Sequence, residues 1–140
     1  MTVSDGHGIP LAILTETAST HEVKLIEPLI RRVRIPRRGR GRPKTKLRRL
    51  IDDKAADSDR LRRELKRRGT DLIAPHRDNR VWQRTQDGRK LRRYRRRWKI
   101  ERTFAWIQNF RRLVVRHDRK ITMFDAYLQL GCTIISLNKL

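Results

Sequence analysis

A strand, a helix and a second strand in close succession constrain the fold of this chain more than any other feature of its sequence. Residues 47–51 predict the first strand and residues 70–75 the second. The helix between them is indicated by a cap, two apolar positions four residues apart and a glycine stop: Asp57 or Ser58, Leu61, Leu65 and Gly69. Strands connected through a helix pair in parallel, so the sequence predicts an α/β fold.

The beginning of the chain carries the signals of a β-hairpin. A turn sequence at residues 5–8 separates residues 2–4 from the apolar run at residues 9–15. Only three residues are left for the strand before the turn. We therefore expect the chain to begin inside a fold.

Three helices are expected outside the β-α-β unit. Thr20 can cap a helix that runs to Val33 and that Pro28 can break or kink. Residues 94–110 predict a long helix with a polar and an apolar stripe. A terminal helix at about residues 122–138 is apolar enough that we expect it to be buried.

The charge of the chain indicates a polyanionic partner. Lys and Arg number 37 against 15 Asp and Glu, which gives a net charge of +22 and a sequence pI of about 11.7. A compact protein with this field repels itself unless a polyanion binds, so nucleic acid is the expected partner. A membrane is not expected, because no basic amphipathic anchor stands out and the longest apolar run is too short and polar to span a bilayer.

The length and the cysteine content bound the class of protein. A length of 140 residues suits one domain with a modest core. Cys132 is the only cysteine, which excludes a disulfide framework and a cysteine-based zinc site. The first residues do not have the pattern of a signal peptide. We expect a cytoplasmic, nucleoid-associated protein.

Residues 31–49 form a basic loop in this interpretation. The segment holds eleven Lys or Arg, two Pro and two Gly, which favours a flexible linker over a packed element. Within it, Arg40, Gly41, Arg42 and Pro43 resemble an AT-hook core, which places arginines in the narrow minor groove of DNA. The alternative is an ordinary solvated loop.

The helix at residues 94–110 places one acid among many arginines. At about 100° per residue, a stripe roughly 60° wide contains Tyr94, Arg97, Glu101 and Gln108. Glu101 either forms an ordinary ion pair with Arg97 or has a function that needs a carboxylate there. Asp53, at the tip of the strand at residues 47–51, is a second acid placed where it could act together with Glu101. Carboxylates from separate elements can hold Mg²⁺ or Mn²⁺ for phosphoryl transfer, whereas the alternative for Asp53 is an ordinary acid near a helix start.

Other side chains have a functional and a structural interpretation. Arg111 and Arg112 are candidates to contact DNA phosphate, with a solvated face as the alternative. Trp82, in the polar loop at residues 76–93, is a candidate for base stacking. Trp98 and Trp106 are expected to belong to the core or its rim.

Two blocks of the sequence resemble bacterial insertion-sequence DDE transposases, of the group named for insertion sequence five. Residues 50–62 are similar to the D-x-x-Y-D-S-D-x-L-R block around the second catalytic aspartate of that family. Residues 92–106, with 110–113, are similar to its Y-(2)-R-(3)-E-(6)-K signature around the catalytic glutamate. The similarity extends over essentially the whole chain, including residues 5–11 and 20–22.

The resemblance implies roles for particular residues. Asp53 corresponds to the second metal-binding aspartate and Glu101 to the third acid. Tyr94 and Arg97 match the tyrosine and arginine of the signature, which implies a position near the DNA strand that is cut. The implied fold is a ribonuclease-H-like mixed sheet flanked by helices, the implied cofactor is Mg²⁺ or Mn²⁺, and the implied substrate is DNA at the terminal repeats of an element.

The sequence departs from the family pattern at three points. The first catalytic aspartate of the family lies on a strand upstream of the hairpin, and Asp5, in the turn, does not correspond to it. Ala56 stands where the family usually has tyrosine, and Gln108 where it has lysine or arginine. We therefore expect an N-terminally truncated catalytic domain that cannot cut DNA alone. A frameshift, an internal start or decay of the element would each produce it.

Two functions of different classes stay open. The first is a C-terminal fragment of a DDE transposase, which cuts and joins DNA when the product of an upstream frame supplies the first aspartate; a second copy of the chain is a further expected partner. The second is a non-catalytic basic protein that binds DNA or RNA. Asp53 and Glu101 distinguish the two, because a pure binder gains nothing from acids that face phosphate.

Overall fold

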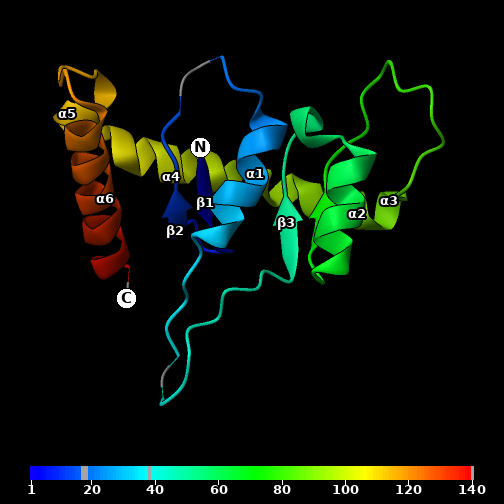
Figure 1. The fold of residues 1–140 in the computed structure, drawn as a ribbon, viewed down its shortest axis with the longest axis horizontal. Helices are drawn as coiled ribbons and strands as arrows, with labels where there is room; N and C mark the ends of the chain where they lie inside the picture. Colours follow the sequence, from blue (N-terminus) through cyan, green and yellow to red (C-terminus); the bar gives the residue numbers. More distant parts are fainter. Residues whose placement is uncertain (17–18, 38, 140) are drawn as a thin grey trace.

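The computed structural model describes residues 1–16, 19–37 and 39–139, so Arg38 of the predicted basic loop lies outside the described residues. Figure 1 shows the fold. In chain order its elements are β1 (Thr2–Ser4), β2 (Pro10–Ile13), α1 (Glu22–Arg31), β3 (Arg49–Ile51), the 3₁₀ helix η1 (Lys54–Ala56), α2 (Asp59–Arg67), β4 (Asp71–Ile73), α3 (Gly88–Leu91), the 3₁₀ helix η2 (Arg92–Arg97), α4 (Trp98–Gln108), α5 (Arg111–Val114) and α6 (Ile121–Leu137).

The predicted β-hairpin is present. β1 and β2 pair in antiparallel fashion, with Thr2 opposite Ile13. Asp5 closes the turn, because its Oδ1 accepts hydrogen bonds from the backbone N–H groups of His7 (2.8 Å) and Ile9 (2.9 Å). Gly8 has φ of +83°, a conformation that residues with a Cβ rarely adopt.

The predicted β-α-β unit is also present, and its helix has the expected limits. β3 and β4 pair in parallel, with Leu50 opposite Leu72. Ser58 caps α2 by accepting a hydrogen bond from the N–H of Leu61, and Gly69 follows the helix with φ of +75°. The α/β class is therefore confirmed.

The strands form two separate pairs rather than the single mixed sheet that we expected. Within the described residues, β1 pairs only with β2 and β3 only with β4. Figure 1 shows α1 in front of the strands and α4 behind them. Local sequence patterns specify strands but not which distant strand edges meet, so the pattern alone could not show this separation.

One apolar cluster nevertheless connects the two strand pairs through α1. It contains Ile26 and Leu29 of α1, Val3 of β1, Leu50 of β3 and Leu65 of α2. The side chain of Leu29 is completely buried. Burial of these side chains fixes α1 across both pairs.

Several predicted limits differ from those observed. α1 begins after His21 rather than at Thr20, and Pro28 lies inside it. The expected helix at residues 94–110 begins as the 3₁₀ turn η2 and is α-helical only in α4. Within the basic loop at residues 31–49, Ile35 and Lys44 exchange backbone hydrogen bonds of 2.9 and 2.8 Å.

The terminal helix α6 is buried on one side only, which corrects the expectation of a buried helix. Leu128 and Ile135 pack against Ile107 of α4, whereas Leu130 is 55% and Leu137 65% exposed. No helix in the described part of the chain has the length and apolar character that crossing a membrane requires.

Candidate functional site

Asp53 is positioned by the end of β3. The parallel pairing continues through Asp52, whose N–H donates to the carbonyl of Ile73 (3.0 Å), and the chain then turns into η1. Asp53 caps this turn, since its Oδ1 accepts a hydrogen bond from the N–H of Ala55 (2.7 Å). Oδ2 faces Arg97 of η2.

Glu101 is positioned by contacts between α4 and the β1–β2 turn. The carbonyl oxygen of Gly8 accepts a hydrogen bond from the buried hydroxyl of Thr103 (2.7 Å). Lys99 and Arg102 donate to the carbonyls of Gly6 and His7 in the same turn. Sequence reasoning recognised the turn but missed that it anchors this helix, because nothing in the local pattern links segments about 95 residues apart.

Arg97 brings the two predicted acids together. Its Nη2 lies 3.7 Å from Oδ2 of Asp53, and its Nη1 lies 3.9 Å from Oε1 of Glu101. Both separations exceed the roughly 2.7–2.9 Å of a charge-assisted hydrogen bond. The Asp53 side chain is 34% exposed and that of Glu101 66%. The guanidinium thus lies loosely between two solvent-accessible carboxylates.

Asp52 is a further acid at this site, which the sequence analysis did not single out. Burial raises the pKa of Asp52 to about 6, and the negative charge of Asp53 adds to this effect. The hydrogen bond from the Asp53 N–H acts in the opposite direction and lowers the pKa. Two consecutive aspartates directly after a strand were the signal that could have identified Asp52. Successive side chains of a strand point to opposite faces, so one of the two aspartates is expected to be more buried than the other.

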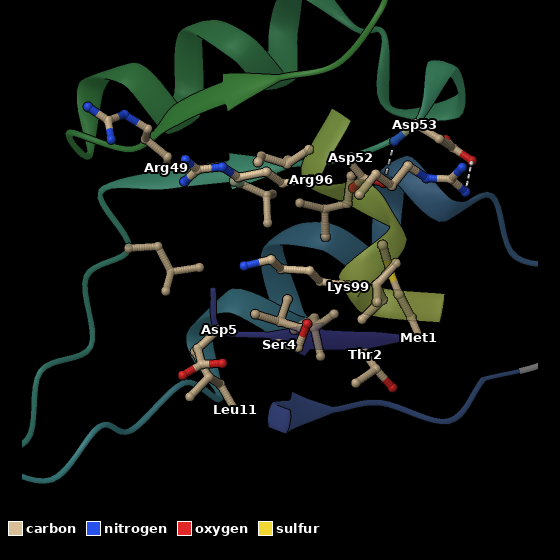
Figure 2. A pocket seen from close by; sticks show the side chains of 18 of the residues that line it. Met1, Thr2, Ser4, Asp5, Leu11, Arg49, Asp52, Asp53, Arg96 and Lys99 are labelled. Atoms are coloured by element: carbon tan, nitrogen blue, oxygen red, sulfur yellow. Dashed lines mark hydrogen bonds and ion pairs between the residues drawn. The ribbon is translucent and has the colours of Figure 1, made fainter. Parts of the chain in front are cut away.

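A cavity of about 570 Å³ begins at these acids and continues between β1 and β3. Asp52 and Asp53 line one end of it, and Asp5 and Arg49 lie at the other (Figure 2). Its lining includes Arg93, Arg96, Arg97 and Lys99 from η2 and α4. Glu101 is outside the lining, at the rim beside Arg97.

The donor atoms fit a hard divalent cation only in part. Asp53 and Glu101 present carboxylate oxygens, the ligands that Mg²⁺ and Mn²⁺ prefer. The described residues contain no cluster of three or more His, Cys, Asp or Glu side chains arranged to hold a metal ion. The two acids could hold a cation in place of the Arg97 guanidinium, but they form an incomplete site.

The predicted DNA-contacting residues do not all lie near these acids. Tyr94 and Arg97 belong to η2, and Arg97 lies beside Asp53. Tyr94 raises the pKa of Lys54 as a minor contributor after Asp78. Arg40 and Arg42 are exposed in the loop that precedes β3, whereas Asp53 follows this strand, so they lie at opposite ends of it (Figure 1).

Arg111 and Arg112 lie beyond the C-terminal end of α4, in α5. Arg112 donates to the hydroxyl of Tyr127 (2.6 Å) and lies 4.7 Å from the centre of its ring, so it is engaged in packing. Arg111 is exposed. Of the two, Arg111 is the freer to contact phosphate.

Trp98 is more exposed than expected, whereas Trp106 is partly buried against the cluster of Ile107, Leu128 and Ile135. Arg102 lies between Trp98 and Trp106, 5.1 and 5.0 Å from their ring centres, and Trp98 is 51% exposed. Trp98 is therefore not a core residue. Trp82 is 78% exposed in a loop where the Arg80 guanidinium donates to its carbonyl (3.0 Å).

Comparisons with known proteins agree with the resemblance. Residues 1–136 match the family model described as "Transposase DDE domain". The chain is 38% identical over 138 residues to a Burkholderia cepacia protein, "Putative transposase for insertion sequence element IS402". This match covers 99% of the chain but 62% of that relative. No solved structure matches the chain. Because the family model matches nearly the whole length of the chain, this chain belongs to the family of transposase DDE domains.

Proposed function

We propose that the chain acts in DNA transposition as the C-terminal part of a transposase catalytic domain. The observation that carries the proposal is the placement of Asp53 and Glu101 on either side of Arg97. The sequence resemblance assigns these two residues to acids of the family. Family membership and the α/β arrangement support a ribonuclease-H-like fold for the complete domain. The chain spans 62% of the length of its relative, so we propose, on the basis of family membership, that the complete protein carries out transposition.

In the proposed site, Asp53 and Glu101 hold a divalent cation, Mg²⁺ or Mn²⁺. When bound, the cation would activate a water or a 3′-hydroxyl and stabilise the leaving oxygen. Asp53 is held by its hydrogen bond to Ala55, and Glu101 by the contacts of α4 with the hairpin turn. Arg97 would then be free to turn towards a DNA phosphate, which its guanidinium can bind through two hydrogen bonds.

The proposed substrate is DNA, in particular the terminal repeats of an insertion sequence. Support comes from the net charge of +22 and from the exposed basic residues of the loop at residues 31–49 and of η2. Neutralising phosphates with these residues releases counterions and favours binding. We propose that two acids are too few for cleavage, so the chain alone binds DNA and needs a further carboxylate to cut it.

A cleavage assay on terminal-repeat DNA tests the proposal. The chain alone is expected to bind without cutting, and the chain supplied with the product of its upstream frame is expected to cut. Glu101→Gln keeps the shape of the side chain but removes its charge, so cleavage should fall by about a thousandfold with binding almost unchanged.

Glu64→Gln is the matched control, because Glu64 is a partly exposed glutamate of α2 that pairs with Arg60 at 3.0 Å. It should leave cleavage unchanged. Cleavage that survives Glu101→Gln would contradict the catalytic role. It would favour the second candidate, a basic nucleic-acid-binding protein without catalytic activity.

A further inference from the structure

Four exposed apolar side chains form a stripe along the outer face of α6. Met123, Leu130 and Leu137 follow one another at intervals of seven residues, and Ile134 lies one turn beyond Leu130. Between 37% and 65% of each residue is exposed. At about 100° per residue, the four side chains fall within roughly 60° of the helix circumference. A continuous exposed apolar stripe marks an interaction surface.

This outer face carries no charge, although 37% of the residues of the chain are charged. Its remaining exposed positions include Ala126 and Thr133, between the apolar residues. Throughout residues 121–137, all of which the structure describes, Asp125 is the only charged residue. Asp125 lies on the inner side of the helix, where it accepts a hydrogen bond from the hydroxyl of Thr15. The outer face therefore offers a partner apolar contacts and no ion pair.

A second copy of the chain fits this face, because the stripe is symmetrical about its centre. Met123 lies seven residues before Leu130, and Leu137 lies seven residues after it. If two α6 helices lie antiparallel with a twofold axis at Leu130, each Leu130 meets its own counterpart, and each Met123 meets Leu137 of the other copy. A twofold interface needs such a self-complementary patch. A seven-residue apolar repeat is also the spacing at which two helices pack side by side.

The position of α6 reduces the repulsion between two copies that each carry a net charge of +22. Figure 1 shows α6 at one end of the long axis of the molecule, with α4 on its inner side. A copy that docks on the outer face extends this axis, so the basic loop at residues 31–49 and η2 of the two copies stay apart. Charges separated by more than about 8–10 Å are largely screened at physiological salt. The uncharged face of α6 is thus where two like-charged copies can meet.

We propose that two copies of the chain pair through the outer faces of α6, with the helices antiparallel and Leu130 at the twofold axis. The pair needs neither DNA nor metal, so it goes beyond the proposed function and does not rest on it. A helix of 17 residues is about 25 Å long, so the interface is at the small end of stable protein interfaces. The dimer is therefore weak, with a Kd of about 10 μM. In Figure 1, β3 lies away from α6, so pairing leaves the candidate site at the end of β3 uncovered.

Analytical ultracentrifugation of the full chain, without DNA or metal, tests the pairing. Leu130→Glu places two carboxylates at the twofold axis and should weaken the dimer at least about a hundredfold. Val81→Glu is the matched control, since it makes the same change at an apolar residue that is 93% exposed in the loop at residues 76–93. The control should leave the Kd unchanged, and circular dichroism verifies that both variants are folded. A wild-type chain that stays monomeric at about 100 μM, tenfold above the expected Kd, would overturn the proposal. So would a dimer that survives in a folded Leu130→Glu variant.

Disulfide cross-linking tests the antiparallel arrangement. Cys132 is the only cysteine of the chain, so Cys132→Ser provides a background without thiols. In that background, Leu130→Cys should form a disulfide between the two copies on mild oxidation, because the two side chains meet at the axis. Met123→Cys should not, since antiparallel pairing separates these two positions by about 20 Å along the helices. A disulfide between copies of Met123→Cys, without one in Leu130→Cys, would show parallel helices and overturn the proposed geometry.

The dependence on salt distinguishes direct pairing from copies that residual nucleic acid holds together. Lys120 precedes α6 and Lys139 follows it, so antiparallel pairing brings Lys120 of each copy towards the Lys139 end of the other. Salt screens this repulsion, so pairing should tighten as NaCl rises from about 0.1 to 0.5 M. Binding to nucleic acid weakens as salt rises. Association that weakens with salt would therefore overturn the proposal, while the roles of Asp53 and Glu101 would still be tested by the cleavage assay.

Discussion

Asp57 illustrates how one buried carboxylate organises the loop that follows β4. Its side chain is 2% exposed, and it accepts hydrogen bonds from Arg62 Nη2 and from the backbone N–H of Arg77, both at 2.9 Å, while His76 Nδ1 lies 2.9 Å away. Burial alone would raise the pKa of Asp57, but the hydrogen bonds from Arg77, Arg62 and His76 outweigh it and lower the pKa to about 2. Sequence analysis identified only a candidate helix cap at this position.

Asp57→Asn should destabilise the fold in a pH-dependent way. The folded pKa of about 2 lies below the ordinary value of 3.8, so ionised Asp57 stabilises the folded state above pH 3.8. This contribution, about 2 kcal/mol, is lost as the pH falls from about 4 through about 2. Urea unfolding at pH 7 and pH 2.5 should show the difference between wild type and variant shrinking at the lower pH.

Asp78→Asn is the control for this measurement. Asp78 is 89% exposed and pairs with Lys54 at 2.8 Å, so its loss should change stability by about 0.5 kcal/mol or less. Equal effects of the two substitutions would contradict the role of Asp57.

At the scale of elements, the contact between the β1–β2 turn and α4 determines where Glu101 lies. Gly8 takes part in two ways. Its φ of +83° disfavours side chains, and a Cβ there would lie 3.2 Å from the carbonyl oxygen of Lys99. The helix can approach the turn closely because this residue has no side chain.

Gly8→Ala should therefore weaken the contact between the turn and α4. The expected loss of stability is about 1–2 kcal/mol, because the positive φ and the close approach act together. Amide hydrogen exchange should become faster in α4 than in α2. Gly6→Ala provides a matched control in the same turn, where an added Cβ meets no atom within 4 Å. A Gly8→Ala variant as stable as Gly6→Ala would show that the turn does not hold the helix.

In the molecule as a whole, the exposed arginines of the loop at residues 31–49 lie apart from the candidate acids. The loop at residues 31–49 extends away from the body of the molecule in Figure 1, on the side opposite to the end of β3 where Asp53 follows. Arg40 and Arg42 are exposed in this loop. A DNA duplex bound there would reach Asp53 and Glu101 only by passing along the molecule.

Replacing both loop arginines tests whether this region contacts DNA. The double variant Arg40→Ala with Arg42→Ala should lower duplex affinity and reduce the slope of log K against log salt by about two. The control, Arg63→Ala with Arg67→Ala, removes the same charge from exposed positions of α2. Fluorescence anisotropy across a salt series measures both. Equal slopes of log K against log salt for the two double variants would show that only the net charge of the protein affects DNA binding, and not the position of the loop arginines.

The elements were largely predictable, whereas the sequence named candidate site residues without showing how they are arranged. Ser58 and Gly69 mark the ends of α2 because capping and positive φ are local requirements. The start of α4 was not predictable. The basic segment before it forms a 3₁₀ turn, and the spacing of apolar residues does not distinguish a 3₁₀ turn from the first turn of an α-helix. The exposure of Leu130 and Leu137 on α6 was missed because the composition of a helix does not show how many neighbours cover it.

Backbone propensity, side-chain spacing and charge are properties of short segments, so the sequence alone predicted most of the strands and helices, the strong positive charge and the acids worth testing. The fold was needed to show that Arg97 lies between Asp53 and Glu101, that Asp57 anchors a loop and that a cavity lies between β1 and β3. These features depend on contacts between distant segments. Such contacts follow from packing and hydrogen bonding of the whole chain, which no local pattern contains.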